Sequence, residues 1–423
     1  MSSVKTLAVA TLTIAACWLL STNAAQAASG YVSGYLQHYQ NQGNYCANDG
    51  RSCYNATYLE SEFHTPVPVR NVELYIRNQN DVVIGTGHTD TNGYYNMYWS
   101  SPTMPTAASV YWTMRHWDGR FQVFTSSGAT GILWFSGFNV VNGTTFSAPQ
   151  NLSTATWGSA GAPHQYTNAY DGAEKMWRNS LSWSTRMNST FSNLSIRAFS
   201  DSVPYANCGT SCAFGSLNLI QLDANAAYKP QARIMHEMGH IASYKSNPFI
   251  NGGNYCYPAT AGTCGWSLTT AEWRAASFEE GLATFFGDTA LYWGPNPEPL
   301  TCLSVGACSR AAANNVETST GTVCGVGEDR WALSVDRYLR DMYDTVDDPG
   351  FNEAMYRPYS EFFDVLAQFS AGTANHQGDE PWNASYTAID NYDGRAATDD
   401  FAFNFTSLTG LTSVNQYTYN CTP

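Results

Sequence analysis

Residues 231–240 read Gln-Ala-Arg-Ile-Met-His-Glu-Met-Gly-His, so the stretch ends in the pattern His-Glu-x-x-His. On an α-helix, positions four apart lie on the same face, and the imidazoles of His236 and His240 would therefore project side by side. Two imidazoles placed in this way can hold a single metal ion. Glu237 would lie about 100° around the helix from His236, close to the open side of that ion.

The charge of Glu237 favours a metal site over a structural role for the two histidines. If both histidines were core residues satisfied by backbone groups, a charged carboxylate on a largely apolar helix would be buried at high cost without a partner. Next to zinc, a carboxylate can accept a proton from a water molecule whose pKa the ion has lowered to about 7. The sequence therefore predicts one zinc ion per chain, with His236 and His240 as ligands and Glu237 as the general base.

A catalytic zinc ion usually has three protein ligands, so a third must come from elsewhere in the chain. A metzincin would have glycine and histidine where this chain has Ser243 and Ser246, which excludes that class. Residues 277–288 read Ser-Phe-Glu-Glu-Gly-Leu-Ala-Thr-Phe-Phe-Gly-Asp. This stretch resembles the gluzincin metallopeptidases, in which a second helix supplies a glutamate in the pattern Glu-Gly-x-Ala, often followed by an aromatic residue. The resemblance implies that Glu280 is the third ligand and that Glu237 is the base.

Three alternatives to Glu280 stay open. Glu279 is one, because adjacent helical residues diverge and only one of the two glutamates can face the metal. Ser277 and Glu280 also fit a helix capping box, in which the glutamate only satisfies a backbone donor. His376, the only histidine after His240, is the main candidate ligand from outside this helix.

Two further residues are assigned roles near the metal. Asp288 lies two turns after Glu280 on about the same face, where it can hold a ligand histidine from behind. A solvated or capping aspartate explains Asp288 equally well. His376 or one of the many tyrosines is a candidate donor to the oxyanion that hydrolysis generates, and an ordinary surface histidine is the simpler alternative.

The first 27 residues have the pattern of a secretory signal peptide. Lys5 gives a positive start, residues 7–20 are almost wholly apolar, and Ala25-Gln26-Ala27 is a small-x-small cleavage site. The apolar run is too short for a comfortable membrane span, and no later segment reaches that length. We therefore expect a secreted protein without a transmembrane segment. Residues 14–17 also resemble a bacterial lipobox, so a periplasmic protein or one anchored through a lipid on Cys17 is the alternative.

Without Cys17, ten of the 11 cysteines remain, an even number that suits disulfides in an oxidising compartment. A thiolate metal site is disfavoured because the chain has no Cys-x-x-Cys pair. The gap of 39 residues between His240 and Glu280 is longer than in thermolysin-like enzymes, and we interpret it as an insertion closed by one of these disulfides. Spacing suggests the pairs Cys46–Cys53, Cys208–Cys212, Cys256–Cys264, Cys302–Cys308 and Cys324–Cys421.

Residues 28–150 predict an accessory domain that is an antiparallel β-sandwich. Apolar residues alternate with polar ones in several short runs, which is typical of half-buried strands. Asp118-Gly119 between two such runs is a strong hairpin signal. The clearest inward-facing sets are Val72, Leu74 and Ile76, and Tyr95, Met97 and Trp99.

Residues 68–74 and 89–95 resemble the transthyretin-like, carboxypeptidase-regulatory type of β-sandwich. The resemblance implies a module that packs beside a peptidase or contacts its substrate. The aromatic residues between 94 and 138 could form a face that stacks on sugars. The simpler interpretation is that they form cross-strand aromatic pairs within a sandwich.

After a Ser-, Thr- and Gly-rich stretch at residues 151–161, helical periodicity predominates. We expect residues 151–423 to form an α+β, zincin-like metallopeptidase domain with a largely helical C-terminal half. Strands are expected at 194–199 and 217–222, and by the zincin resemblance the second is the edge strand that pairs with an extended substrate. Helices are expected near residues 170–187, 230–244, 270–291, 328–343 and 358–369.

Composition excludes two broad classes of protein. Hydrophobic residues make up 43% of the chain, which is too many for an intrinsically disordered protein. The net charge is −14 and no cluster of Lys and Arg occurs, so nucleic acid is not an expected partner. Residues 340–352 are rich in oxygen donors and suggest a Ca²⁺ site, but without EF-hand spacing a helix ending in an acidic loop is the simpler interpretation.

Together these features predict a secreted zinc metallopeptidase that acts on a protein or peptide substrate. We expect an endopeptidase because no feature recognises a free chain end. Two alternatives stay open: an extracellular binding or adhesion protein with a structural metal site, and a zinc hydrolase of a non-peptide substrate.

Overall fold

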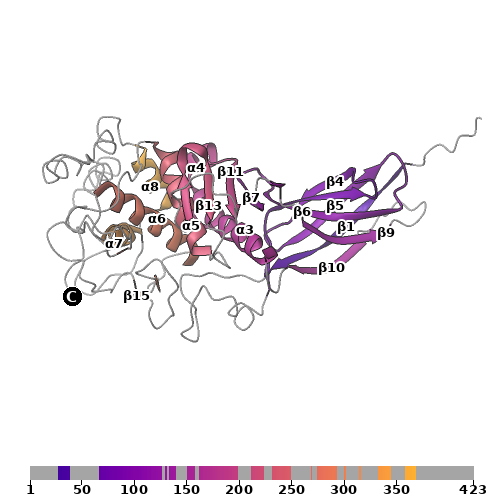
Figure 1. Ribbon diagram of the computed structural model, residues 1–423, viewed down its shortest axis with the longest axis horizontal. Helices are drawn as coiled ribbons and strands as arrows, with labels where there is room; N and C mark the ends of the chain where they lie inside the picture. The colour runs from indigo at the N-terminus through magenta and orange to yellow at the C-terminus, as the bar shows by residue number, and fades with distance from the viewer. Residues whose placement is uncertain are drawn as a thin grey trace, which may run out of the picture.

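The protein is a mixed α/β protein with strand-rich sheets and, within the part of the chain that is described, six α-helices. Most strands gather at one end of the molecule, and α5 to α8 lie at the other (Figure 1). The computed structural model describes residues 27–38, 66–125, 129–130, 133–139, 150–157, 162–198, 211–222, 231–248, 268, 274–292, 300–301, 314–315, 332–343 and 358–367.

The smaller of the two main sheets is built around β1 (Ala28–His38). β10 (Gln150–Trp157) pairs with one edge of β1 in parallel, with Val32 opposite Gln150. β2 (Val67–Pro68) and β5 (Tyr94–Ser101) pair with β1 in antiparallel fashion. The outer face carries tilted cross-strand tyrosine pairs rather than one flat surface; the ring centroids of Tyr31 and Tyr98 are 5.2 Å apart at an angle of 58°.

The larger sheet runs in the order β12-β13-β11-β7-β6-β3-β4, with β8 beside β7 and β9 beside β6. Its first four strands form the part next to the helices, where β13, β11 and β7 are parallel and β12 is antiparallel to β13. The bounds are β3 Val72–Asn78, β4 Val83–His88, β6 Ala107–His116, β7 Phe121–Thr125, β8 Ala129–Thr130, β9 Leu133–Asn139, β11 Leu194–Ala198, β12 Ser211–Phe214 and β13 Leu219–Leu222. β14 (Leu300–Thr301) and β15 (Asn314–Asn315) form a separate short ladder.

The alternation predicted for the strand-rich region is confirmed. Val72, Leu74 and Ile76 on β3 are fully buried, and Tyr95, Met97 and Trp99 on β5 are almost so. The predicted Asp118-Gly119 hairpin also forms between β6 and β7. Gly119 has a φ of +72°, and its N–H donates to the carbonyl of His116 at 2.8 Å.

Strand pairing crosses the predicted domain boundary at residue 150 in both directions. β10, which follows that residue, pairs with β1, and β7, which precedes it, pairs with β11. The parallel pairing of β1 with β10 departs from an all-antiparallel sandwich. Residues 151–157, the first part of the Ser-, Thr- and Gly-rich stretch, are strand. The domain limits 28–150 and 151–423 themselves remain predictions.

One predicted helix is divided. Residues 170–187 contain the end of α3 (Ala162–Asn179), a 3₁₀ turn at Leu181–Trp183 and the start of α4 (Thr185–Thr190). The division falls at Ser184, whose side chain accepts the backbone N–H of Met187 at 3.3 Å and so caps the second helix. The other predicted helices are confirmed as α5 (Gln231–Ser246), α6 (Arg274–Tyr292), α7 (Ala332–Tyr343) and α8 (Tyr359–Leu366).

A buried polar cluster joins the strand-rich end to the start of α5. Asp171 on α3 lies 3.4 Å from Nε2 of His38 on β1 and accepts a hydrogen bond from Gln231, the first residue of α5. Lys175 donates to the same Gln231 side chain at 3.0 Å. Burial opposes ionisation of Asp171, but the charge and hydrogen bond of His38 hold its pKa well below the ordinary value. This cluster fixes the point from which α5 begins.

The described residues bear only in part on two sequence predictions, the export leader and the disulfides. No helix within them is long and apolar enough to cross a membrane. Cys212 on β12 is disulfide-bonded. All the other cysteines of the predicted pairs, Cys208 included, and residues 1–26 of the leader lie outside the described residues, so the pairings and the signal peptide stay predictions.

Candidate metal centre

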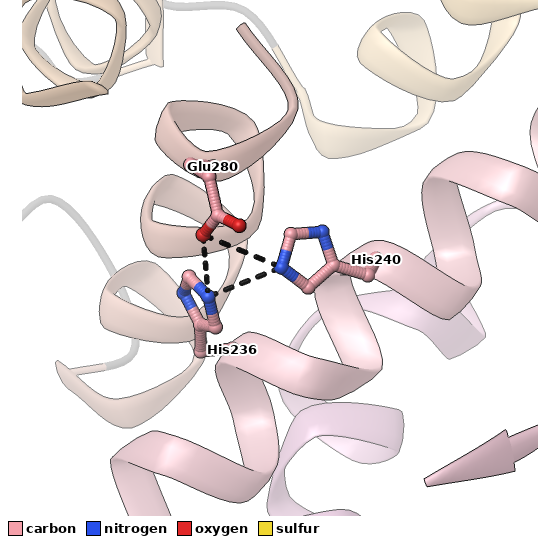
Figure 2. A group of neighbouring side chains, drawn as sticks. All are labelled: His236, His240 and Glu280. Carbon is pink, nitrogen blue, oxygen red and sulfur yellow. Dashed lines mark hydrogen bonds and ion pairs between the residues drawn. The ribbon is translucent and has the colours of Figure 1, made fainter. Parts of the chain in front are cut away.

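α5 carries the two histidines on one face, as the four-residue spacing predicts. Their Nε2 atoms are 3.1 Å apart, and the rings stand at 90° to each other. The helix is held rigidly because its apolar side is fully buried; Ile234, Met235 and Met238 have no exposed surface. The ring ends point together to one place beside α6 (Figure 2).

α6 brings Glu280 to the same place. Oε2 of Glu280 lies 3.1 Å from Nε2 of His236 and 3.5 Å from Nε2 of His240. The three side chains converge from two helices, and one ligand atom from each lies within 4.8 Å of the others (Figure 2). The structure therefore brings together the three residues that were predicted as ligands.

The donor set and its dimensions fit a tetrahedral zinc ion. Bonds of about 2.0–2.2 Å at tetrahedral angles would place the ligand atoms about 3.3–3.6 Å apart, close to the 3.1 to 3.5 Å of the three side chains. If both rings carry their proton on Nδ1, the two Nε2 lone pairs face each other across 3.1 Å, and a cation between them would remove that repulsion.

The electrostatics of the site favour a positive charge. Burial alone would lower the pKa of His240, but the charge of Glu280 and a hydrogen bond to Glu279 outweigh it and raise that pKa well above the ordinary value. Burial likewise opposes ionisation of Glu280, yet the two histidines hold its pKa well below the usual range. A pocket with these properties attracts a cation.

Glu279 contacts the other edge of a ligand ring. Its Oε1 lies 3.3 Å from Nδ1 of His240, and both side chains are 12% exposed. Burial raises the pKa of Glu279, and the hydrogen bond to His240 opposes that rise. Glu279, the alternative to Glu280 as a ligand, thus lies at the other nitrogen of His240, where a carboxylate can hold the ring with Nε2 toward Glu280.

Thr284 lies at Nδ1 of His236, as Glu279 lies at Nδ1 of His240. Its Oγ1 lies 3.3 Å from Nδ1 of His236 and donates its own hydrogen to the carbonyl of Glu280 at 2.8 Å. With that hydrogen already used, the hydroxyl oxygen is left to accept from Nδ1–H. This tautomer frees Nε2 of His236 for a metal.

The alternative of a capping box at Ser277 is wrong. α6 begins at Arg274, so Ser277 lies within the helix and not at its N-cap. Its side chain is fully buried.

Small residues allow the two helices that carry the candidate ligands to approach closely. A Cβ on Gly239, within the His-Glu-x-x-His stretch, would lie 2.7 Å from Cα of Ala283. A Cβ on Gly287 would lie 3.0 Å from the backbone nitrogen of His236. Gly281 faces α7, where a Cβ would lie 2.5 Å from the carbonyl oxygen of Ala332. The Gly and Ala of the Glu-Gly-x-Ala pattern therefore let α6 pack between two neighbours.

Glu237 is buried beside the end of the sheet. It is 6% exposed, and its Oε1 accepts a hydrogen bond of 2.6 Å from the hydroxyl of Ser211 on β12. The edge strand was predicted at residues 217–222, and this prediction is wrong. β13 pairs with β11 on one side and with β12 on the other, so among the described strands β12 is the one at the end of the sheet beside Glu237.

Of the remaining predicted site residues, Asp288 lies within the described part of the chain and His376 does not. Asp288 is buried on α6, and its charge raises the pKa of the buried Tyr359, although burial is the larger cause. Thr284 and Glu279, rather than Asp288, lie at the Nδ1 atoms of the ligand histidines. His376 and residues 344–352 of the suggested Ca²⁺ loop lie outside the described residues.

Comparisons with known proteins leave the function to be inferred from this geometry. No protein-family model and no curated protein matches the chain. Among solved structures, a 9R-lipoxygenase from Cyanothece PCC8801 matches with a TM-score of 0.17 and 10% sequence identity. That match covers 52% of this chain and 23% of the lipoxygenase chain, and at such a TM-score it says nothing about fold or function.

Proposed function

We propose that this protein is a zinc-dependent hydrolase that cleaves peptide bonds. The observation that carries the proposal is the convergence of His236, His240 and Glu280 on one point, with the buried carboxylate of Glu237 on the same helix as the histidines. A structural zinc site is usually closed by four protein ligands and has no need of a base beside it. Three ligands with an adjacent carboxylate are typical of a catalytic site.

Different side chains of the protein have different roles in the proposed reaction. A zinc ion held by the three ligands would polarise a substrate carbonyl and make a water molecule acidic enough to lose its proton near neutral pH. Glu237 accepts that proton and passes it to the departing amine. Glu279 and Thr284 hold the ligand rings in place.

The position of β12 supports a peptide as substrate. Among the described strands β12 ends the larger sheet on the side of Glu237, and an extended peptide that lay along such a strand would be held close to that carboxylate. The Glu-Gly-x-Ala resemblance supports the same class and a zincin-like domain. An adhesion protein with a structural metal site would not need the Glu237 carboxylate, and a non-peptide substrate would have no need of a strand beside Glu237.

The decisive experiment is hydrolysis of casein and of a quenched fluorescent peptide library by the purified protein. Both a chelator and Glu237→Ala should abolish cleavage, and Zn²⁺ should restore only the chelated wild type. Metal analysis should find about one zinc per chain in the wild type and in Glu237→Ala, but not in His240→Ala. Full hydrolysis by Glu237→Ala would refute the mechanism, and cleavage of esters or glycosides but no peptides would refute the substrate class.

We also propose that the protein is exported, on the basis of the leader pattern at residues 1–27. Mass spectrometry of the mature N-terminus separates the two routes of export. A chain beginning at Ala28 supports signal peptidase cleavage, and a lipid on Cys17 supports anchoring. An uncleaved Met1 in the mature protein would contradict export through this leader.

A further inference from the structure

A hydroxyl group lies between an arginine and the glutamate that is proposed as the base. Ser211 on β12 donates its hydrogen to Oε1 of Glu237 at 2.6 Å, and Arg233 on α5 donates from Nη1 to the same Ser211 oxygen at 3.2 Å. The three groups thus form a chain of hydrogen bonds from guanidinium to hydroxyl to carboxylate. Ser211 is the only one of the three that comes from the sheet.

Without the hydroxyl, these two charges would be expected to pair directly. Arg233 and Glu237 are four residues apart on α5 and so lie on one face of the helix. An arginine near a carboxylate commonly binds it with two parallel hydrogen bonds, which engage both oxygens. A carboxylate engaged in this way has both of its oxygens directed to the guanidinium.

The position of Ser211 is fixed by the sheet rather than by α5. Ser211 pairs with Leu222 at the end of the β12–β13 ladder, and Leu222 is fully buried. The hydroxyl is therefore brought to Glu237 from a rigid neighbour, and Oε1 is the oxygen that it engages.

We infer that Ser211 is a positioning residue for the general base. It holds Glu237 through Oε1, keeps the Arg233 guanidinium from closing onto the carboxylate, and leaves Oε2 directed to the reacting water. This inference rests on the function proposed above and adds to it a residue that acts through Glu237 without touching the substrate.

The kinetic test compares three variants of the full chain loaded with zinc. In Ser211→Ala we expect kcat to fall about 100-fold, because a displaced base loses much of its effect, while KM and zinc content stay unchanged. Ser211→Thr keeps the hydroxyl and should recover most of the activity. Ser211→Ala combined with Arg233→Met should be more active than Ser211→Ala alone, because no guanidinium is left to pair with Glu237.

A crystal structure of Ser211→Ala gives a readout that does not need activity. We expect a guanidinium nitrogen of Arg233 within 4 Å of the Glu237 carboxylate, the usual distance for an ion pair. The inference would be overturned if the two groups stayed apart in that variant or if its kcat were unchanged. It would also be overturned if Ser211→Thr lost as much activity as Ser211→Ala. Failure of the wild type to cleave peptides would refute the proposed function instead, and the crystal structure would still decide whether Ser211 keeps the two charges apart.

Discussion

Glu279 lies 3.3 Å from Nδ1 of His240, on a different edge of the ring from the one that faces the metal site. The next residue, Glu280, lies 3.5 Å from Nε2 of the same ring. Two consecutive acids on α6 therefore hold one imidazole at its two nitrogens. One of them is placed to bind the metal and the other to orient the ligand, so removing each should have a different consequence.

Glu279→Gln should weaken zinc binding about 10- to 100-fold, because partners behind a ligand histidine commonly contribute that much to affinity. The amide can still contact Nδ1 but carries no charge to strengthen the bond. Competition against a chromogenic chelator measures the affinity. Glu280→Gln is the matched control and should lose far more, since it removes a ligand rather than its support. The opposite order would show that Glu279 is the ligand.

Thr284→Val should lower zinc affinity about tenfold with little loss of stability, because valine has the shape of threonine but no oxygen to accept from Nδ1 of His236. Thr289→Val is a close control. Thr289 is buried on α6 as Thr284 is, and its hydroxyl also donates to the carbonyl four residues before it. If both variants bind zinc equally well, the contact of Thr284 with His236 is not used to orient the ring.

The sequence predicts those parts of the site that follow from helical periodicity. The 3.6-residue period alone predicts that His236 lies beside His240. The same period puts Thr284 one turn after Glu280, so it could also have predicted Thr284 near the site. Assigning Glu280 rather than Glu279 depended on a resemblance, because periodicity alone cannot say how a helix is rotated against its neighbour. That rotation is set by tertiary packing at Gly239 and Ala283.

Features that depend on distant pairing were missed. Ser211 lies 26 residues before Glu237 on another element, and no local pattern connects them. The strand at residues 150–157 consists mostly of polar and small residues, and its register comes from β1, far away in the chain. The break at Ser184, in contrast, had a local signal, since serine is a favoured N-cap.

Gly239→Ala should destabilise the protein and weaken zinc binding together. The added Cβ would meet Cα and the carbonyl oxygen of Ala283 at 2.7 and 2.9 Å, and a backbone cannot move aside as a flexible side chain can. Overpacking of this kind costs about 1–3 kcal/mol in unfolding free energy, and separating α5 from α6 would also displace Glu280 from the histidines.

Gly172→Ala is the control for a helical glycine with a less severe contact. Its Cβ would come no nearer than 3.2 Å to Gln231, and alanine favours a helix by about 1 kcal/mol over glycine. Thermal unfolding with and without zinc measures both variants. If Gly239→Ala binds zinc as tightly as Gly172→Ala, the close approach of α5 and α6 is not required for the site.

Acid should destabilise the strand-rich end through His116, which is 3% exposed at the end of β6. Burial, reinforced by the charges of Arg120 and His88 and opposed by Asp118, lowers the pKa of His116 to about 4 from 6.5. Between these two pH values the unfolded chain binds a proton that the folded chain does not. Stability should therefore fall as the pH drops from 6.5 towards 4 and level off below that, by about 3 kcal/mol in total.

The variant His116→Gln should lose this part of the pH dependence while being less stable at neutral pH, because glutamine fills the aromatic surroundings of Phe121 and Trp177 less well. His88→Gln removes one of the charges that lower the pKa of His116, so it should reduce the fall in stability without abolishing it. Urea unfolding at a series of pH values gives the free energies. Parallel profiles for the wild type and His116→Gln between pH 4 and 6.5 would mean that another group carries the acid sensitivity, because a buried neutral histidine must produce a slope in that interval.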